Sequence, residues 1–113
     1  MLPNAYSLKT KFEFNISKKY GTYYYGKYFH MYVLKPINYK GTSKIGIVIS
    51  NKFDSKAVVR NRVKRIFKMC FRDFILSKND LWVVIYPKVI CKSKSYEEIC
   101  VDVNKVLPKV LIK

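Results

Sequence analysis

The residues best suited to bind another molecule are the basic side chains in the middle of the chain. Between Lys52 and Arg72 they are opposed only by Asp54, and they are Lys52, Lys56, Arg60, Arg62, Lys64, Arg65, Lys68 and Arg72. Like charges four residues apart destabilise a helix by roughly 0.2–0.5 kcal/mol per pair. A phosphate-binding face would explain this cost, because each cation that neutralises a phosphate releases counterions and arginine can bind phosphate through two N–H groups. A plain solvated surface is the alternative.

A second group of candidates is aromatic. From Lys27 to Leu34 the residue types alternate as in a β-strand. One side would carry Phe29, Met31 and Val33, and the other Tyr28, His30 and Tyr32. Unpaired nucleotides stack on aromatic rings with about 1–3 kcal/mol per base and without a strict sequence requirement. The second side is therefore either a stacking surface for single-stranded nucleic acid or a half-exposed sheet face.

Catalysis by the protein itself has little support in the sequence. His30 is the only histidine, and one imidazole cannot supply both a general acid and a general base. No cluster of carboxylates suggests a two-metal site. Cys70, Cys91 and Cys100 are widely spaced and lack a CxxC pair, which argues against zinc. We expect no catalytic residue and no metal ligand in the protein, and we expect Cys70 and Cys100 to be reduced core residues on helices.

Composition restricts the possible partners. The chain has 113 residues, with 23 Lys plus Arg, 7 Asp plus Glu, a net charge of +16, and 50% hydrophobic residues. This predicts one folded domain, residues 1–113, and excludes a disordered basic tail. A polyanion, either nucleic acid or an acidic membrane, would relieve the self-repulsion. Nucleic acid is favoured because no apolar run reaches about 20 residues. Residues 1–7 lack the features of a signal peptide, so we expect a cytoplasmic protein without a membrane partner.

Periodicity predicts the elements that position these residues in the first half of the chain. Leu8 to Lys19 has the spacing of a short helix, ended by Gly21 as a residue that tolerates positive φ. Tyr23 to Tyr25 could form a short strand before the aromatic one. A turn containing Pro36, Asn38 and Gly41 then leads to a strand in which Ile45, Ile47 and Ile49 alternate with Gly46 and Val48.

The second half begins with the basic segment, which should be a helix capped by Asp54 or Ser55 and ending near Leu76. Its apolar stripe is Val59, Val63, Ile66, Phe67, Cys70 and Phe74. A buried central strand follows at 81–86 and ends at Pro87, and a last helix begins with the capping box Ser95/Glu98 and is limited by Pro108. The order α-β-β-β-α-β-α predicts an α+β fold: a two-layer sandwich with three helices and a mixed sheet of about four strands.

Several of these residues together resemble the bacterial ribonuclease P protein family. The strand at 44–50, then Lys52, the helix start at 57–65 and Phe71-Arg72 resemble its signature, which centres on Arg60-Asn61-Arg62. Further matching residues are Leu8, Lys9, Phe14, Gly21, Phe29, Tyr32, Leu34 and Val83 to Ile85. The resemblance implies a protein subunit that binds a catalytic RNA and the 5′ leader of precursor tRNA. It also implies that the RNA holds Mg²⁺ and removes the leader, and that the strand–helix–strand crossover is left-handed.

The resemblance assigns two sets of residues. Those against the catalytic RNA would be Lys52, Lys56, Arg60, Asn61, Arg62, Lys64, Arg65 and Lys68. Those against the leader would be Phe14, Lys18, Lys27, Tyr28, His30 and Tyr32. Phe14 is also suited to the core, and Lys18 replaces a second aromatic that the family commonly has, so its contact would be electrostatic. No small-molecule substrate is implied.

Some features depart from the family or leave alternatives open. Asn51-Lys52 and Ser55-Lys56 replace the usual Lys-Lys and Gly-Asn, so the helix start should differ in detail. The Tyr23 to Tyr25 cluster is not a hallmark of the family, and the sequence gives it no role. A ribosomal protein or general RNA chaperone would use the same basic helix without an aromatic groove. A membrane-surface protein would need its apolar stripe exposed, and an autonomous nuclease has the least support.

Overall fold

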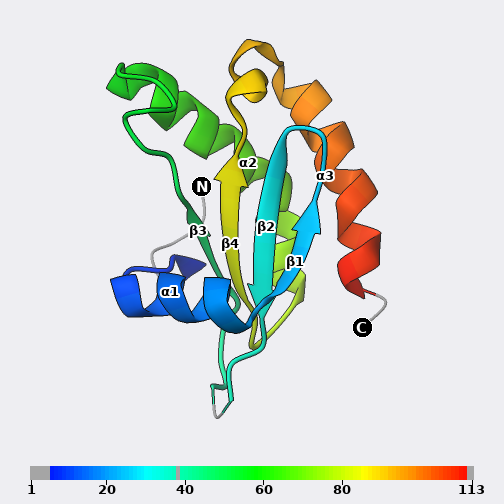
Figure 1. The fold of residues 1–113 in the computed structure, drawn as a ribbon. Coiled ribbons are helices and arrows are strands. Elements are labelled where there is room, and N and C mark those ends of the chain that lie inside the picture. The colour runs from blue at the N-terminus through cyan, green and yellow to red at the C-terminus, as the bar shows by residue number, and fades with distance from the viewer. Residues whose placement is uncertain (1–5, 38, 112–113) are drawn as a thin grey trace.

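The computed structural model describes residues 6–37 and 39–111, in which three helices and four strands follow the predicted order (Figure 1). The elements are α1 (Lys11–Tyr20), β1 (Thr22–Tyr25), β2 (Phe29–Leu34), β3 (Lys44–Ile47), α2 (Ala57–Ser77), β4 (Trp82–Pro87), the short 3-10 helix η2 (Val89–Ser93) and α3 (Tyr96–Leu111). The α+β class is confirmed. Asn38, which the sequence placed in a turn, lies outside the described residues.

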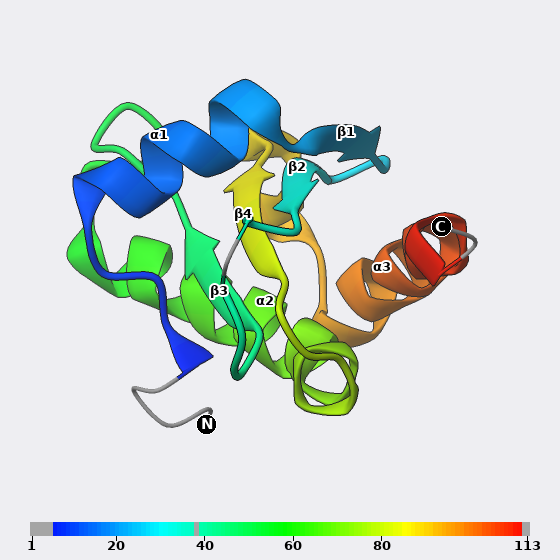
Figure 2. The ribbon, with the colours of Figure 1, turned by 90° about the horizontal axis from the view of Figure 1, so that it is seen from below.

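The four strands form one mixed sheet in the order β1-β2-β4-β3. β2 pairs antiparallel with both β1 and β4, whereas β3 pairs parallel with β4. α2 and α3 cover one face of this sheet, and α1 lies across the other (Figure 2). The sheet therefore has one face shared by two long helices and another that α1 covers only in part.

The connection from β3 to β4 has the rare hand. In Figure 1 both strands run upward, with β3 to the left of β4, and α2 passes behind the sheet between them. A crossover that moves to the right behind the sheet is left-handed, whereas about 98% of such units are right-handed. The crossover hand implied by the family resemblance is therefore present.

The core has two parts on opposite faces of β4. The larger lies between the sheet and α2 and α3, where the Phe29 ring packs edge-on against Phe67 and Phe71 at centroid distances of 5.6 and 5.8 Å. The smaller lies beneath α1 around Leu8, Trp82 and Val84. Because β4 contributes side chains to both, it is buried on both sides, as its continuous apolar run predicted.

The ends of α1 differ from the prediction. The helix begins at Lys11 rather than Leu8, because the Leu8 amide donates to Ile45 of the sheet and Thr10 forms a capping box with Glu13. Gly21 ends the helix with φ −74°, so the expectation of a positive φ is wrong. Glycine is required there because a Cβ would overlap the Ser17 carbonyl oxygen.

Other boundaries also differ. β3 ends at Ile47, two residues early. Neither Asp54 nor Ser55 caps α2: Lys56 holds the cap position without a side-chain hydrogen bond, and the Asp54 carboxylate accepts from the Lys56 amide instead. Thus α2 starts later than the cap residues suggested.

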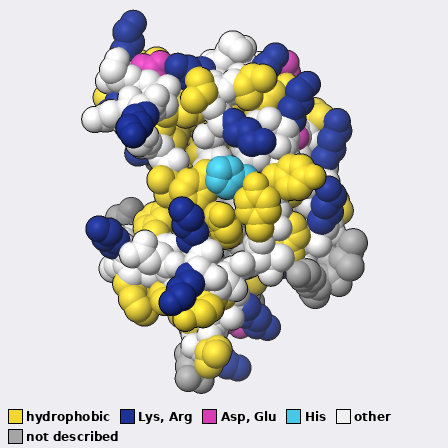
Figure 3. All heavy atoms as spheres, in the orientation of Figure 1, with side chains coloured by type: hydrophobic (Ala, Val, Ile, Leu, Met, Phe, Trp, Pro, Cys, Tyr) yellow, Lys and Arg dark blue, Asp and Glu magenta, His cyan; other side chains and the backbone are white. Residues whose placement is uncertain are grey.

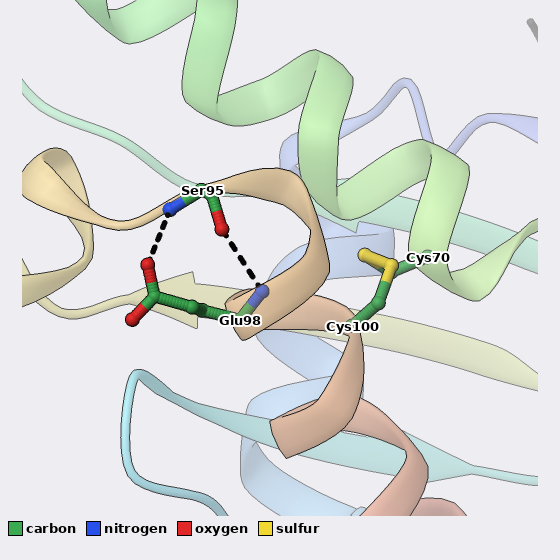
Figure 4. The surroundings of a disulfide bond; sticks show 4 residues. All are labelled: Cys70, Ser95, Glu98 and Cys100. Carbon is green, nitrogen blue, oxygen red and sulfur yellow. Dashed lines mark hydrogen bonds between the residues drawn. A yellow bond between two sulfur atoms is a disulfide. The ribbon is translucent and has the colours of Figure 1, made fainter.

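The last helix starts as predicted but ends later. The Ser95 amide donates to Glu98 and the Glu98 amide donates to the Ser95 hydroxyl, at 3.1 and 3.2 Å, which confirms the capping box (Figure 4). α3 continues through Pro108, so the proline does not limit it. Burial of Val106 and Val110 on either side of the proline holds this last turn against the core.

The expectation that Cys70 and Cys100 are reduced is wrong, because a disulfide joins them (Figure 4). Their helices pack side by side and place the two Cα atoms 5.2 Å apart, within the range that a disulfide requires. Cys91 is buried as a free thiol, and burial raises its pKa to about 11. Within the described part of the chain, no helix is both long and apolar enough to cross a bilayer.

Candidate nucleic-acid interface

Aromatic rings from three neighbouring strands meet on the α1 side of the sheet. We call Tyr23, Tyr25, His30, Tyr32 and Tyr86 the aromatic face. The His30 and Tyr86 rings are stacked, with centroids 5.0 Å apart and planes at 10°, and the Tyr32 ring lies edge-on to Tyr86 at 5.9 Å. Tyr23 lies 5.4 Å from Tyr32, 5.7 Å from His30 and 6.0 Å from Tyr25. The rings thus form a continuous series across β1, β2 and β4.

Strand register explains this arrangement. Tyr23 lies opposite Tyr32, Tyr25 opposite His30, and His30 opposite Tyr86. Directly opposed residues project to the same side of a sheet, so these rings are placed together by pairing alone. In Figure 3 the single histidine, in cyan, is surrounded by hydrophobic side chains with lysine and arginine side chains near them.

Two lysines give this face its local charge. The Lys18 ammonium lies 5.5 Å from the Tyr86 ring centroid, as expected for a cation–π contact. Partial burial, followed by the charges of Lys88 and Lys18, lowers the pKa of His30. His30 is therefore a neutral ring at pH 7, while the lysines remain available for phosphates. Burial, with a smaller effect of Tyr32, raises the pKa of Tyr86, so its hydroxyl stays protonated.

A groove leads from the aromatic face toward the start of α2. It has a volume of about 320 Å³, and its lining includes His30 and Tyr86 of the aromatic face and Ser50, Lys52 and Phe53 of the loop before α2. Lys52 was assigned to the catalytic-RNA set and His30 to the leader set. The loop between β3 and α2 therefore brings Lys52 into the same groove as His30 of β2.

Phe14 and Lys18, both on α1, occupy different environments. Lys18 is exposed beside Tyr86, whereas Phe14 is partly buried against the small cluster beneath α1. The Phe14 ring lies on Gly46 of β3 so closely that a Cβ at Gly46 would overlap it. Phe14 therefore has a packing role, which the sequence had left open beside leader binding.

Lys27 and Tyr28 are not part of the aromatic face, so the expectation that Tyr28 shares a side with His30 and Tyr32 is wrong. Tyr28 is only 6% exposed and belongs to the main core. The backbone amides of Lys27 and Tyr28 both donate to the buried Asp102 carboxylate of α3 at 2.9 Å. These bonds hold the turn between β1 and β2 against α3, and alternation begins only at Phe29, where β2 begins.

Three members of the aromatic face were missed as binding candidates. Tyr23 and Tyr25 had no assigned role, and Tyr86 was treated only as part of a buried strand. Alternation along β1 could have placed Tyr23 and Tyr25 on one side of that strand. Their position beside His30 and Tyr32, and that of Tyr86, depends on which strands flank β2 and in what register, which a single sequence does not reveal.

The basic residues assigned to the catalytic RNA lie on α2 and on the loop before it. Two arginines hold backbone carbonyls: Arg60 donates to Asp54 at 2.8 Å, and Arg62 donates to Lys92 and Lys94 at 3.4 and 3.2 Å. The remaining members, apart from Lys52, are Lys56, Asn61, Lys64, Arg65 and Lys68, of which Lys56, Asn61 and Arg65 are exposed.

The cations of α2 form no ion pair with an acidic side chain of the residues that the structure describes. The ion pairs between described residues are Lys44 with Glu13, Lys92 with Asp54, and Lys94 with Glu98, and none includes a cation of α2. The first turn of α2 has no acidic residue, although the amide dipoles favour negative charge there. This helix therefore carries positive potential that an external anion would neutralise. Over residues 6–37 and 39–111, no three His, Cys, Asp or Glu side chains group as metal ligands do.

Comparison with known proteins gives this geometry its context. The family model described as Ribonuclease P matches residues 2–111. The chain belongs to the ribonuclease P protein family. A ribonuclease P protein component of Pseudanabaena sp. (strain PCC 6903) is 32% identical over 113 residues, which cover 99% of this chain and 97% of that relative. A ribonuclease P protein component of Rickettsia felis is 31% identical and covers 95% of both chains.

Solved structures of ribonuclease P proteins share the fold. The RNase P protein of Staphylococcus aureus superposes with a TM-score of 0.82 at 21% identity, over 95% of this chain and 96% of that one. The RNase P protein of Thermotoga maritima gives a TM-score of 0.73 at 22% identity, over 88% and 92%. Membership of the ribonuclease P family leaves the ribosomal-protein and RNA-chaperone alternatives without support.

Proposed function

We propose that this chain is the protein subunit of a ribonuclease P holoenzyme, with α2 against the catalytic RNA and the aromatic face against the 5′ leader of precursor tRNA. The observation that carries the proposal is the pairing of two unlike surfaces in a ribonuclease P family member. One is a helix whose cations pair with no acidic side chain in the described part of the chain, and the other is an aromatic sheet face flanked by lysines. The groove lined by His30 and Tyr86 of the aromatic face also includes Lys52, on the loop that leads into α2.

The charge on α2 fits structured RNA. Phosphate contacts position a protein on a nucleic acid without reading its sequence. Arg65 is exposed, and no hydrogen bond or ion pair joins its side chain to the described part of the chain. Its five N–H donors are free to bind phosphate. Arg62 would combine RNA binding with its structural contacts to the loop at 92–94.

The aromatic face fits unpaired nucleotides. Stacked and edge-on rings offer π surfaces to bases of any identity, and Lys18 and Lys88 can approach the phosphates. Precursor tRNAs differ in leader sequence, so a surface that stacks without reading base edges suits a protein that must accept many of them.

We further propose that the RNA subunit holds Mg²⁺ and hydrolyses the phosphodiester bond, while the protein positions the substrate. Mg²⁺ is bound by a few carboxylates and by phosphate oxygens. This division of labour extends the family resemblance. It predicts that RNA-free protein leaves precursor tRNA intact and that the reconstituted holoenzyme removes the leader at low Mg²⁺.

Reconstitution with Arg65→Ala tests the proposal. We expect weaker assembly with the catalytic RNA and a slope of log affinity against log salt that is about one unit shallower, because one phosphate contact is lost. Lys109→Ala on α3 is the matched control, since it removes the same charge from a different helix and should leave the slope unchanged. Equal slopes for Arg65→Ala and the wild type, or cleavage by the protein alone, would overturn the proposal.

A further inference from the structure

Strand β1 exposes two tyrosines that the core does not require. Tyr23 and Tyr25 are 51% and 62% exposed, whereas Tyr24, which alternates with them, packs partly against the main core. β1 is one of the two edge strands of the sheet. Single exposed aromatics are common, but these two rings contact each other and continue an aromatic series. They therefore call for an explanation beyond the stability of the fold.

We propose that β1 extends the leader-binding surface, with Tyr23 and Tyr25 supplying further stacking positions for unpaired nucleotides beyond those that contact β2 and β4. This inference rests on the proposed function, because it assigns the same ligand class to the adjoining part of the same face. It gives the tyrosine cluster a role in substrate binding: the chain would hold a longer stretch of single-stranded RNA than the rings of β2 and β4 can reach.

The geometry supports a continuous surface. From Tyr86 to His30, Tyr23 and Tyr25, successive ring centroids are 5.0, 5.7 and 6.0 Å apart. The Tyr23 and Tyr25 planes are inclined by only 29°, so both present similarly oriented surfaces. A strand running across several stacking rings can engage them one after another, as single strands do on other aromatic sheet surfaces.

Charge near the extension suits the RNA backbone. Lys88 donates to the carbonyl oxygen of Gly26, the residue after β1, at 3.3 Å, and its charge acts on His30. Lys18 approaches Tyr86 on β4, the other end of the ring series. Lysines thus accompany both ends of the aromatic face, and phosphates between stacked bases could reach them.

The same observations favour single-stranded RNA over a second copy of the chain. An edge strand can pair with another protein, but two molecules of net charge +16 repel each other. A duplex hides its base faces and would leave the exposed rings unused. An RNA single strand supplies bases that can stack on the exposed rings. It also supplies the negative charge that would neutralise the nearby lysines.

The test measures the affinity of the reconstituted holoenzyme for precursor tRNAs whose leaders are lengthened one nucleotide at a time. We expect Tyr32→Ala to lose affinity at the first lengths at which the leader contributes. Tyr23→Ala and Tyr25→Ala should bind short-leader substrates normally and lose roughly 5- to 10-fold only with longer leaders. Tyr23→Phe and Tyr25→Phe, which keep the ring, should remain close to the wild type.

Tyr20→Ala is the matched control, because Tyr20 is a 63% exposed tyrosine on α1 outside the aromatic face. Its affinity should not depend on leader length any differently from that of the wild type. Leader-dependent loss in Tyr32→Ala with none in Tyr23→Ala or Tyr25→Ala would overturn the role of β1 and leave the proposed function standing. No leader-dependent loss in any variant would remove leader binding by the aromatic face as well.

Two other outcomes also contradict the inference. Equal loss with all leaders in the β1 variants, together with a lower melting temperature, would show that the tyrosines serve the fold through cross-strand pairing. A dimer of the free protein that disappears in Tyr23→Ala, seen by analytical ultracentrifugation, would assign β1 to self-association.

Discussion

His30 occupies the middle of the aromatic face, where it acts as a neutral stacking ring and not as a positive charge. It stacks on Tyr86, and partial burial together with the nearby Lys88 and Lys18 lowers its pKa. A protonated imidazole would add a third positive charge to this cluster. The surrounding residues therefore keep His30 neutral in the free protein, and a bound phosphate would reverse that preference.

This leads to a prediction with opposite signs for folding and binding. The pKa of His30 lies below its ordinary value of 6.5 in the folded state, so its contribution to stability is present above pH 6.5 and is lost as the pH falls through the lowered pKa. Relative to His30→Phe, the wild type should lose free energy of unfolding, measured in urea, as the pH falls from 7 through 6.5, the ordinary pKa of an unfolded histidine. Its RNA affinity should rise over the same interval, because a nearby phosphate favours the charged form. Parallel pH profiles for the two proteins would contradict this.

Single residues also show how far local sequence patterns can be trusted. Alternation along β2 correctly placed His30 and Tyr32 together, because both lie within the regular strand. It failed for Tyr28, which lies in the turn before β2, where bonds to Asp102 decide its direction. The partners on β1 and β4, such as Tyr86, depend on register between distant segments, and that information is not local.

At the scale of elements, α2 was predicted well along its length and less well at its start. Four residues of the predicted apolar stripe, Val63, Ile66, Phe67 and Phe74, are buried as expected. The cap was not found, because Asp54 bonds to the Lys56 amide and to the Lys92 ammonium instead. Helix periodicity is set by the core, whereas cap geometry depends on tertiary contacts of the preceding loop.

The disulfide between α2 and α3 gives a prediction about this pair of helices. A bond that closes a loop with a sequence separation of 30 should stabilise the fold by about 3–4 kcal/mol in the chain-entropy account. Cys70→Ser/Cys100→Ser should lower the free energy of unfolding by that amount, and a reducing agent should bring the wild type to the same value. Urea unfolding with and without the reductant measures both. If the reductant changes nothing in the wild type, the bond contributes no stability.

The pairing itself could not be predicted from the sequence, because it requires α2 and α3 to lie side by side with Cys70 and Cys100 facing each other. A cytoplasmic location had argued for thiols instead, since disulfides are rare in a reducing compartment. Cys91 behaves differently: its thiol is fully buried with a pKa raised to about 11, so alkylation of the folded protein should be slow at neutral pH.

At the scale of the whole molecule, the sequence patterns predicted the α+β class and the strand count, while the hand of the crossover came only from the family resemblance. Periodicity indicates which side of an element is buried, and a left-handed and a right-handed crossover would bury the same sides. The charge of +16, by contrast, is a property of composition and needs no fold. It acts on folding and on binding at once, and salt separates the two effects.

Raising the salt concentration should therefore stabilise the free protein and weaken its complex with RNA. Screening shortens the range of repulsion from about 8 Å at 0.15 M to 3 Å at 1 M, and a gain of 1 kcal/mol in the free energy of unfolding would raise the melting temperature by roughly 4 °C. Affinity for the catalytic RNA should fall about a thousandfold between 50 and 200 mM KCl if six phosphates are contacted. Calorimetry of the free protein and filter binding of the complex measure the two trends. Because hydrophobic burial responds little to KCl in this range, a melting temperature that stays constant would mean that the cations are too far apart, or too well solvated, to oppose folding. RNA binding would then be the only process in which the charge matters.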